Sequence, residues 1–334
     1  MFSNTCVVGL SLFKGGFMKL ITFEDIAQLK IPVETLYSWT EDMIINKNKT
    51  ILPPKISLKP YDGVFCNVMP SFIPGKDSDY EGVKVVTRYP GRMPSLDSKL
   101  LLLDAKSGEF LALMDADWIT AVRTGAVAVH SIMLLAKKNY KTIGMIGLGN
   151  VARATLQILL EKNKNKHFNI KLLKHNDGEK LFVERFKSYH NVTFSFFDDC
   201  HSVVKGSDVV ISCVTYAPQD FCDDQDFDEG VLVVPVHTLG FTNCDLFFDK
   251  VFADDEGHVC HFKNFDKFKS FAEISDVANK LKPGRESEEE RILVYNIGIS
   301  IHDVNFAVHI YDLLKDDNAI QDIRFNGPKD KYWI

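Results

Sequence analysis

The stretch KTIGMIGLGNVARATLQ, residues 141–157, decides the fold. Its first half is an apolar run of strand-forming residues, which breaks at GLGNVA (147–152) before apolar residues return at helical spacing. A strand, a glycine-rich turn and a helix in this order form the G-x-G-x-x-A dinucleotide-binding fingerprint, and a glycine-rich turn in an unrelated α/β unit is the alternative. The predicted cofactor-binding residues of the turn are Gly147, Gly149, Asn150, Val151 and Ala152.

Two patterns fill most of the remaining chain. From residue 141 onward strands and helices alternate, as in a Rossmann-type doubly wound parallel sheet. Its predicted strands are 142–146, 169–173, 192–196, 208–214, 231–236 and 250–254. Residues 55–115 hold strand-like runs whose connections are too short for crossovers, which predicts an antiparallel or mixed sheet. The predicted fold class is therefore α/β, with a Rossmann domain over 139–295 and a smaller α+β domain over 1–138 and 296–334.

Three segments have the apolar spacing of helices: 20–48, 117–137 and 292–315. The small residues of the second segment, Gly125 among them, predict a face for close packing. The first 17 residues lack the basic start of a signal peptide, and a well-patterned segment begins at Met18. We therefore expect residues 1–17 to be an extension and Met18 to be the biological start.

Composition narrows the class of protein. The chain has 334 residues, is 46% hydrophobic and 25% charged, and carries a net charge of −6 without a basic stripe, so we expect no nucleic-acid partner. Seven scattered cysteines without a CxxC pair argue against a disulfide framework or a structural zinc site. They favour a reducing compartment, and we expect a cytoplasmic protein. The sequence contains no run of 18 consecutive apolar residues, so we expect no membrane-spanning helix.

With these elements placed, the chain resembles the ornithine cyclodeaminase/mu-crystallin family. The resemblance extends from Met18 to about Leu314, and four segments carry it: GVKVVTRYPG (82–91), LALMDADWITAVRTGAVA (111–128), IGLGNVA (146–152) and NIGISIHDVNFAVHIYDLL (296–314). It implies a homodimer that binds NAD(H) or NADP(H), acts on the α-carbon of small amino or imino acids, and uses the smaller domain for substrate binding and dimerisation.

The resemblance also implies a set of cationic substrate-binding residues. Lys84 lies in a strand whose neighbours Val83 and Val85 should face the opposite side; an exposed strand lysine is the alternative. The resemblance assigns Lys84 to the substrate pocket, as a carboxylate partner or a proton shuttle. It assigns Arg123 to the junction of cofactor and substrate, where a guanidinium can clamp an anion. Lys55 replaces an arginine that is usual in the family, so the charge stays but the two-pronged geometry is lost.

Further cofactor-binding residues are expected at the carboxyl ends of the Rossmann strands. Lys174 and His175 stand where an acid usually holds the ribose 2′-hydroxyl, which favours NADP over NAD; Asp177 would serve NAD if the strand ended later. Family resemblance adds residues along the nicotinamide half: Thr215, His237, Thr238, Leu239, Gly240 and Asn296. Asp303 matches a family aspartate for which a structural role is expected.

One departure from the family bears on the reaction. Thr242 stands where cyclodeaminases have an aspartate, and a hydroxyl cannot replace a carboxylate as general base. Asp245, three positions on, is the other candidate for a catalytic role. We predict an NAD(P)-dependent oxidoreductase of the C–N bond of a small α-amino or imino acid. An ornithine cyclodeaminase and a non-catalytic, crystallin-like NAD(P)H-binding protein are the alternatives.

Overall fold

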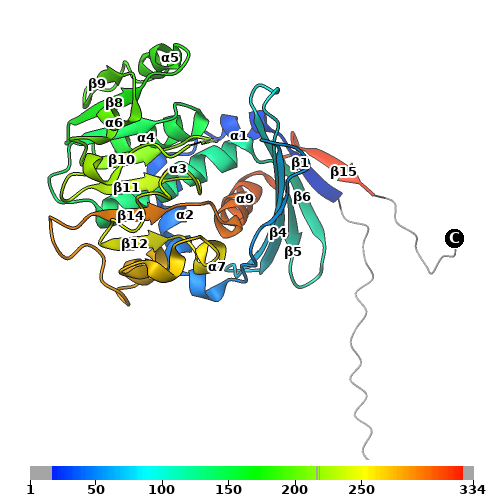
Figure 1. Cartoon of the computed structure of the whole chain (residues 1–334). Coiled ribbons are helices and arrows are strands. Elements are labelled where there is room, and N and C mark those ends of the chain that lie inside the picture. The colour runs from blue at the N-terminus through cyan, green and yellow to red at the C-terminus, as the bar shows by residue number, and fades with distance from the viewer. Residues whose placement is uncertain (1–16, 216, 218, 326–334) are drawn as a thin grey trace, which may run out of the picture.

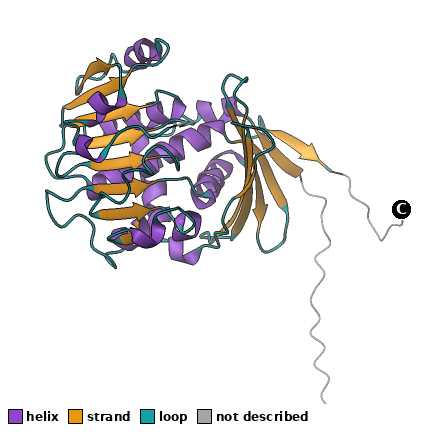
Figure 2. Cartoon of the chain, viewed as in Figure 1, coloured by secondary structure: helices purple, strands orange, loops and turns teal. Residues whose placement is uncertain are grey.

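The computed structural model describes residues 17–215, 217 and 219–325, which form two lobes, each built on one β-sheet (Figure 1). Of the predicted extension over residues 1–17, all but Phe17 lies outside the described residues. The chain passes between the lobes at residues 136–141 and again at residues 296–299. Figure 2 shows the strands of the two sheets on opposite sides of a central group of helices. The domain boundaries at 138/139 and 295/296 remain predictions.

The first lobe, the Rossmann lobe, holds eight strands in the order β13-β12-β14-β11-β10-β7-β8-β9, and every pairing is parallel. The strands are β7 (Thr142–Ile146), β8 (Phe168–Leu173), β9 (Val192–Phe197), β10 (Val209–Ser212), β11 (Leu232–Pro235), β12 (Lys250–Ala253), β13 (Phe271–Glu273) and β14 (Ile292–Tyr295). Its helices are α4 (Asn150–Lys162), α5 (Gly178–Arg185), α6 (Cys200–Val204), η2 (Asp224–Asp226), α7 (Glu256–Val259), η3 (Phe265–Lys267) and α8 (Ile274–Ala278). The strand order reverses between β7 and β10, so a ligand crevice is expected at their carboxyl ends.

The second lobe, the mixed-sheet lobe, holds seven strands in the order β15-β1-β6-β5-β4-β3-β2. All pairings are antiparallel except that of β1 with β6. The strands are β1 (Phe17–Ile21), β2 (Ile56–Leu58), β3 (Phe65–Ile73), β4 (Tyr80–Arg88), β5 (Leu96–Asp104), β6 (Phe110–Asp115) and β15 (Gln321–Arg324). The helices are α1 (Phe23–Gln28), α2 (Val33–Ile45), η1 (Lys47–Lys49), α3 (Asp117–Leu135) and α9 (Ser300–Leu314). The two sheets confirm the predicted α/β fold class.

Helix α3 connects the two lobes. It packs on α4 and β11 of the Rossmann lobe and on α2, α9 and β5 of the mixed-sheet lobe. At Gly125 an added Cβ would lie 2.7 Å from the backbone nitrogen of Thr155 in α4, so only glycine permits this approach. Among the described helices, α3 alone has the length and composition of a membrane span, and 67% of its most apolar window is buried, as in a core helix.

The prediction of one helix over 292–315 was wrong. Residues Ile292–Tyr295 are fully buried and form β14 in the middle of the parallel sheet, and α9 begins only at Ser300. Gly298, with φ +79, makes the turn between them. A short apolar run cannot be assigned to strand or helix by spacing alone, because a central parallel strand is apolar on both faces.

The prediction of one helix over 20–48 was also wrong. This segment contains the end of β1, then α1 and α2. Thr22 starts α1 with a capping box, because its hydroxyl accepts from the backbone N–H of Asp25 while the Asp25 carboxylate accepts from the N–H of Thr22. Pro32 then separates the two helices and precedes the first turn of α2.

Candidate functional site

The glycine turn after β7 has the geometry of a dinucleotide cradle. Gly147 has φ +85, and a Cβ there would lie 2.9 Å from the carbonyl carbon of Cys213, so glycine is required. Gly149 is the N-cap of α4, and a Cβ there would meet nothing within 4 Å. The free N–H groups of the first turn, at Asn150 and Val151, therefore border open space that suits a pyrophosphate. Ala152 is fully buried against the sheet.

Lys84 lies on the inner face of β4, and 0% of its surface is exposed. Val83 and Val85 lie on the other face, where both are partly exposed. A lysine that is fully buried must have partners for its ammonium group, because an unpaired buried charge is very costly. The alternation along the strand is as predicted, and the alternative of an exposed lysine is excluded.

The ammonium group of Lys84 and the guanidinium group of Arg123 meet at one carboxylate. Lys84 Nζ lies 2.7 Å from Asp303 Oδ1, and Arg123 Nε donates to the same oxygen at 2.8 Å. Asp303 comes from α9, is fully buried, and its Oδ2 has no hydrogen-bond partner among the described residues. The two predicted cations therefore converge on an anion, and in this structure the protein supplies it.

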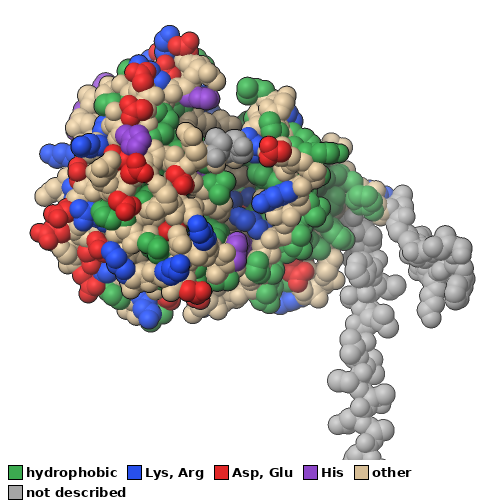
Figure 3. Space-filling model, viewed as in Figure 1, with side chains coloured by type: hydrophobic (Ala, Val, Ile, Leu, Met, Phe, Trp, Pro, Cys, Tyr) green, Lys and Arg blue, Asp and Glu red, His purple; other side chains and the backbone are tan. Residues whose placement is uncertain are grey.

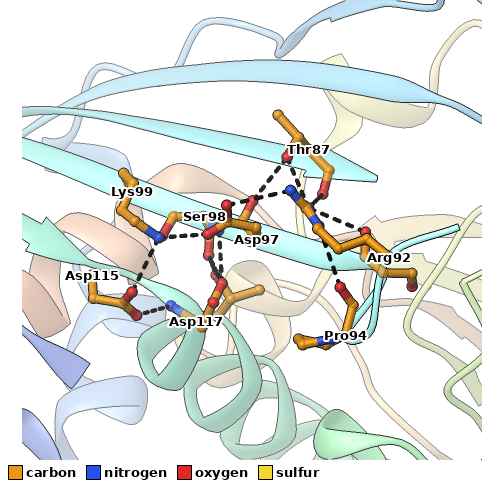
Figure 4. A network of polar contacts seen from close by, with 10 residues as sticks. Thr87, Arg92, Pro94, Asp97, Ser98, Lys99, Asp115 and Asp117 are labelled. Atoms are coloured by element: carbon orange, nitrogen blue, oxygen red, sulfur yellow. Dashed lines mark hydrogen bonds and ion pairs between the residues drawn. The ribbon is translucent and has the colours of Figure 1, made fainter. Parts of the chain in front are cut away.

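The start of α3 fixes where Arg123 lies. Figure 4 shows the polar network that joins β5 to this helix. Asp117 Oδ1 accepts from the backbone N–H of Ser98 at 2.7 Å and from its hydroxyl at 2.9 Å. Asp115 Oδ1 accepts from the N–H of Asp117, and Asp115 Oδ2 lies 3.1 Å from Lys99 Nζ. The first turn of α3 is thus tied to the sheet that carries Lys84, which sets the position of Arg123 relative to Lys84.

Burial and neighbouring charges lower the pKa of both Lys84 and Asp303, for different reasons. Burial, reinforced by the Arg123 guanidinium, lowers the pKa of Lys84 to about 7. Burial alone would raise the pKa of Asp303, but Arg123 and Lys84 together hold it below its usual value. Asp303 is therefore ionised at neutral pH, whereas Lys84 can gain or lose a proton there, as a proton-transfer group requires.

Lys55 lies between this buried cluster and a cavity. Its Nζ donates to the carbonyl of Ile297 at 3.3 Å, and its backbone N–H donates to His258 Nε2 at 3.3 Å. Burial lowers the pKa of Lys55, and its charge interacts with those of Asp254, Arg123 and Asp303. Lys55 is thus the one of the three predicted substrate cations that lines the cavity.

The cavity has a volume of about 780 Å³ and is lined by both lobes. Residues 54–65, Asn67 and Arg88 line it from the mixed-sheet lobe, although Ile56 and Leu58 do not. Thr215, Thr238, Leu239, Gly257, His258, His261 and Phe262 line it from the Rossmann lobe. Figure 3 shows Lys and Arg side chains in the hollow between the lobes. Lys84 and Arg123 do not line the cavity.

The predicted residues after β10 and β11 border this cavity. Thr215, Thr238 and Leu239 line it, and His237 lies behind them. The backbone N–H of Leu239 donates to His237 Nδ1, so Nε2 carries the proton toward the Ser212 hydroxyl at 2.6 Å. Burial lowers the pKa of His237 to about 4, which keeps the ring neutral. Gly240 has φ +91, and a Cβ there would clash with the Phe221 ring.

The end of β8 is less cationic than expected. Lys174 Nζ pairs with Asp198 Oδ1 at 2.9 Å, which compensates its charge. The backbone N–H of His175 donates to Glu179 Oε2. Asn176 and Asp177 both have positive φ, and Asp177 pairs with Lys180. Lys174 and His175 thus stand at the predicted position, but Lys174 already has an acidic partner.

Thr242 and Asp245 lie away from the cavity. Asn264 Nδ2 donates to Asp245 Oδ1 at 2.8 Å and to the carbonyl of Thr242 at 3.2 Å. These bonds hold residues 242–245 against the loop that carries Asn264. Asp245 is 1% exposed, and burial raises its pKa. Neither residue is among the cavity-lining residues. Their catalytic role therefore stays a prediction without geometric support.

Two buried polar groups stand beside the cluster. Asn296, which follows β14, is 1% exposed, and neither side-chain amide atom has a hydrogen-bond partner among the described residues. Asp254, which follows β12, accepts from the Gly298 N–H at 2.9 Å and interacts with the charges of His258, Lys55 and Arg123. Asp254 is not among the predicted site residues, although its place after a strand of the parallel sheet was the available signal.

Known proteins share this architecture, at sequence identities of 23–27%. The chain is 27% identical to the alanine dehydrogenase of Archaeoglobus fulgidus over 320 residues, which cover 88% of this chain and 96% of the relative. The structure superimposes on Thermococcus litoralis Δ1-pyrroline-2-carboxylate reductase in complex with NADH and L-proline with a TM-score of 0.80, at 23% identity, covering 92% of this chain and 100% of that one. An archaeal alanine dehydrogenase dimer with bound NAD gives a TM-score of 0.79 at 23% identity, with 93% and 100% covered.

These names support the predicted class, an NAD(P)-dependent oxidoreductase of small amino or imino acids. The sequence profile of one family matches residues 19–318, nearly the whole chain. The protein therefore belongs to the ornithine cyclodeaminase/mu-crystallin family.

Proposed function

We propose that the protein is an NAD(P)-dependent oxidoreductase that interconverts a small α-amino acid and its imine, or reduces a cyclic imino acid. The observation that carries this proposal is the buried Lys84–Asp303–Arg123 cluster behind a cavity at the carboxyl ends of the parallel strands. Burial lowers the pKa of Lys84 to about 7, so this lysine can exchange a proton at neutral pH.

Residues at the carboxyl ends of the parallel strands fit a nicotinamide dinucleotide. Open space at Gly149 suits the pyrophosphate, and the orphan amide of Asn296 offers the donor and acceptor that a carboxamide needs. When bound, the nicotinamide supplies or accepts the hydride. Lys84 then gives a proton to the reacting nitrogen or takes one from it, and Lys55 and Arg123 orient the substrate carboxylate. The charges of Lys84, Arg123, Lys55 and Asp303 leave a positive excess, which attracts that carboxylate.

A spectrophotometric assay tests the reaction. Purified protein is mixed with NADH or NADPH and with Δ1-pyrroline-2-carboxylate, Δ1-piperideine-2-carboxylate, or pyruvate plus ammonia, and the absorbance of the reduced nicotinamide is followed. Oxidation of the cofactor supports the proposal. Formation of proline and ammonia from ornithine would instead support a cyclodeaminase. Tight cofactor binding without turnover would leave the crystallin-like alternative.

The choice between cofactors belongs to the same assay. His175 and Lys174 support a 2′-phosphate and hence NADP, whereas the Asp198 partner of Lys174 weakens that support. The six described cysteines are free, which supports a reducing, cytoplasmic setting for the enzyme.

Changing Gly149 to Ala is expected to weaken NADH and NADPH binding about tenfold, or 1.4 kcal/mol. The new methyl group would occupy open space that the pyrophosphate needs, so cofactor affinity falls while the fold stays intact. Gly91→Ala is the matched control, since a Cβ there also meets nothing but lies in a distant loop. Nicotinamide fluorescence titration measures the dissociation constants, and an unchanged value for Gly149→Ala would contradict this cofactor site.

The outer face of the mixed sheet supports a homodimer. Pro70, Val83, Leu101 and Leu113 stand opposite one another across β3 to β6, and all are partly exposed. Figure 3 shows apolar side chains gathered over this lobe. A continuous apolar face of this kind is typical of a subunit interface.

Leu101→Glu is accordingly expected to convert a dimer to a monomer in light scattering coupled to gel filtration, because the variant would place two carboxylates in the apolar centre of the interface, one from each protomer. The control Leu313→Glu changes an equally large but exposed residue at the end of α9 and should leave the mass unchanged. A monomeric wild-type protein would contradict the proposed assembly.

A further inference from the structure

The cavity between the lobes has an excess of positive charge. The charged residues that line it are Lys55, Lys59, Arg88 and Asp62. The chain as a whole carries a net charge of −6, so the excess is local. A cleft lined by one sign of charge concentrates ligands of the opposite sign.

The cations form two groups along one strand. Lys84 and Arg88 lie on the same inner face of β4, four residues apart, which separates their Cα atoms by about 13 Å. Lys55 and Lys59 flank β2, which pairs Ile56 with Val68 and Leu58 with Cys66, so Lys55 stands at the Lys84 end and Lys59 at the Arg88 end. Asn67 of β3 pairs with Val86 of β4 and so lies between the two ends. It lines the cavity, and its Oδ1 is buried without a hydrogen-bond partner among the described residues.

Arg88 is held in place at the far end. It is 9% exposed, and its Nη1 donates to the carbonyl oxygen of Gly63, which also lines the cavity. A Cβ at Gly63 would lie 3.2 Å from this nitrogen, so the turn fits closely around the guanidinium. A guanidinium fixed in this way is suited to a carboxylate, whose two oxygens match its fork of N–H groups.

The cofactor does not account for these cations. Its pyrophosphate is expected at Gly149 and the start of α4, and a 2′-phosphate would lie near Lys174; none of these residues lines the cavity. The cavity volume of about 780 Å³ also lies in the upper part of the range of about 300–1,000 Å³ that is usual for ligand sites. It has room for a substrate that reaches beyond the α-carbon.

We propose that the substrate carries a second carboxylate, which Arg88 and Lys59 bind at the end of the cavity remote from Lys84. This inference rests on the proposed function and names its substrate class, an amino or imino dicarboxylic acid. The first carboxylate lies at Lys55 and Arg123, the reacting C–N bond near Lys84, and the second carboxylate beyond Asn67.

Matched substrate pairs test this inference. The wild-type protein is assayed with NAD⁺ and NADP⁺ on L-glutamate against L-glutamine and on L-aspartate against L-asparagine, pairs of similar shape that differ in one charge. We expect kcat/KM for the acid of the better pair to exceed that of its amide at least about tenfold, since a charged hydrogen bond is worth that much or more. Arg88→Gln should reduce the ratio about tenfold, and Arg88→Lys should restore part of it.

Two exposed lysines give a further comparison. Lys59→Gln should lower the acid-to-amide ratio, whereas Lys106→Gln, on a hairpin outside the cavity, should leave it unchanged. Equal kcat/KM for acids and amides would overturn the inference. An Arg88→Gln protein whose kcat/KM falls equally for acids and amides would also overturn it. That result would mean that Arg88 only holds the Gly63 turn in place.

A binding measurement separates this inference from the proposed function. L-glutamate and L-glutamine are titrated calorimetrically into the wild-type and Arg88→Gln proteins with NAD⁺ present. If no substrate turns over but L-glutamate binds and Arg88→Gln weakens its binding about tenfold, the second carboxylate site stands and the proposed reaction fails. If monocarboxylic imines turn over and neither L-glutamate nor L-aspartate is preferred or bound, the reaction stands and the second site fails.

Discussion

Lys84→Met is expected to lower kcat/KM for the preferred substrate by about 10²- to 10⁴-fold, the range for loss of a general acid–base group. Methionine has a similar length and suits a buried position, so the side chain still fills its place on β4. Asp303 keeps its hydrogen bond from Arg123, which leaves no unpaired buried carboxylate. The assay is steady-state turnover at saturating cofactor, with cofactor affinity measured separately as evidence that the Rossmann lobe is intact.

The pH dependence makes this test specific. With the pKa of Lys84 near 7, its ammonium form predominates below that pH and its free amine above it. Imine reduction needs the ammonium as proton donor, so its kcat/KM should fall as pH rises through about 7. Amine oxidation needs the free amine and should rise over the same interval. Lys84→Met should lose this titration in both directions; a variant that retained it would assign the proton transfer to another group.

Asp303→Asn is expected to lower the free energy of unfolding at pH 6 by about 3–5 kcal/mol, because removing one partner of a buried ion cluster leaves uncompensated charge. In this variant the ammonium of Lys84 and the guanidinium of Arg123 face each other without the carboxylate that now touches both. Urea unfolding followed by circular dichroism gives the value.

Two controls separate charge from shape in this variant. The double variant Lys84→Met/Asp303→Asn removes one of the two facing cations and should recover part of the lost stability. The deficit of Asp303→Asn should also shrink as the pH rises from 6 through about 7. The Asp303 carboxylate raises the pKa of Lys84, so without it the folded variant releases the Lys84 proton at a lower pH than the wild type does. Over that interval only the variant binds fewer protons folded than unfolded at this site, and its stability rises toward that of the wild type. A loss of unfolding free energy below about 1 kcal/mol that does not change with pH would contradict the electrostatic explanation.

Local pattern was enough to predict most of the fold. Strands β7, β10 and β11 were predicted because each is a buried apolar run between turns, and the glycine turn was predicted because Gly147 makes the tight bend and Gly149 leaves room for a pyrophosphate. The exceptions were β13, which was not predicted, and β14, whose four apolar residues run directly toward a helix, so that spacing could not distinguish strand from helix. Only the pairing of β14 with β11 and β12 distinguishes it, and pairing between distant segments is not a local property.

The site was predictable to a smaller extent. Alternation along β4 predicted that Lys84 faces away from its valine neighbours, and the same alternation would have marked Arg88, four residues on, as a companion on the inner face. The meeting of Arg123 with Asp303 was not predictable from spacing, because 180 residues separate them and α9 must first pack on the mixed sheet. The seclusion of Thr242 and Asp245 depends on Asn264, a loop residue without a sequence signature.

The two passages of the chain between the lobes have a mechanical consequence. A body attached at two points can turn only about the line through them, and points near that line hardly travel. One attachment, residues 296–299, includes Gly298, where an added Cβ would lie only 2.7 Å from Arg123 Nη1. The guanidinium of Arg123 therefore lies close to one of the two connections, whereas Tyr61 and Leu239 line the cavity from opposite lobes. A rotation of one lobe relative to the other would separate the two walls of the cavity. It would leave Lys84, Arg123 and Asp303 together, because all three belong to the mixed-sheet lobe.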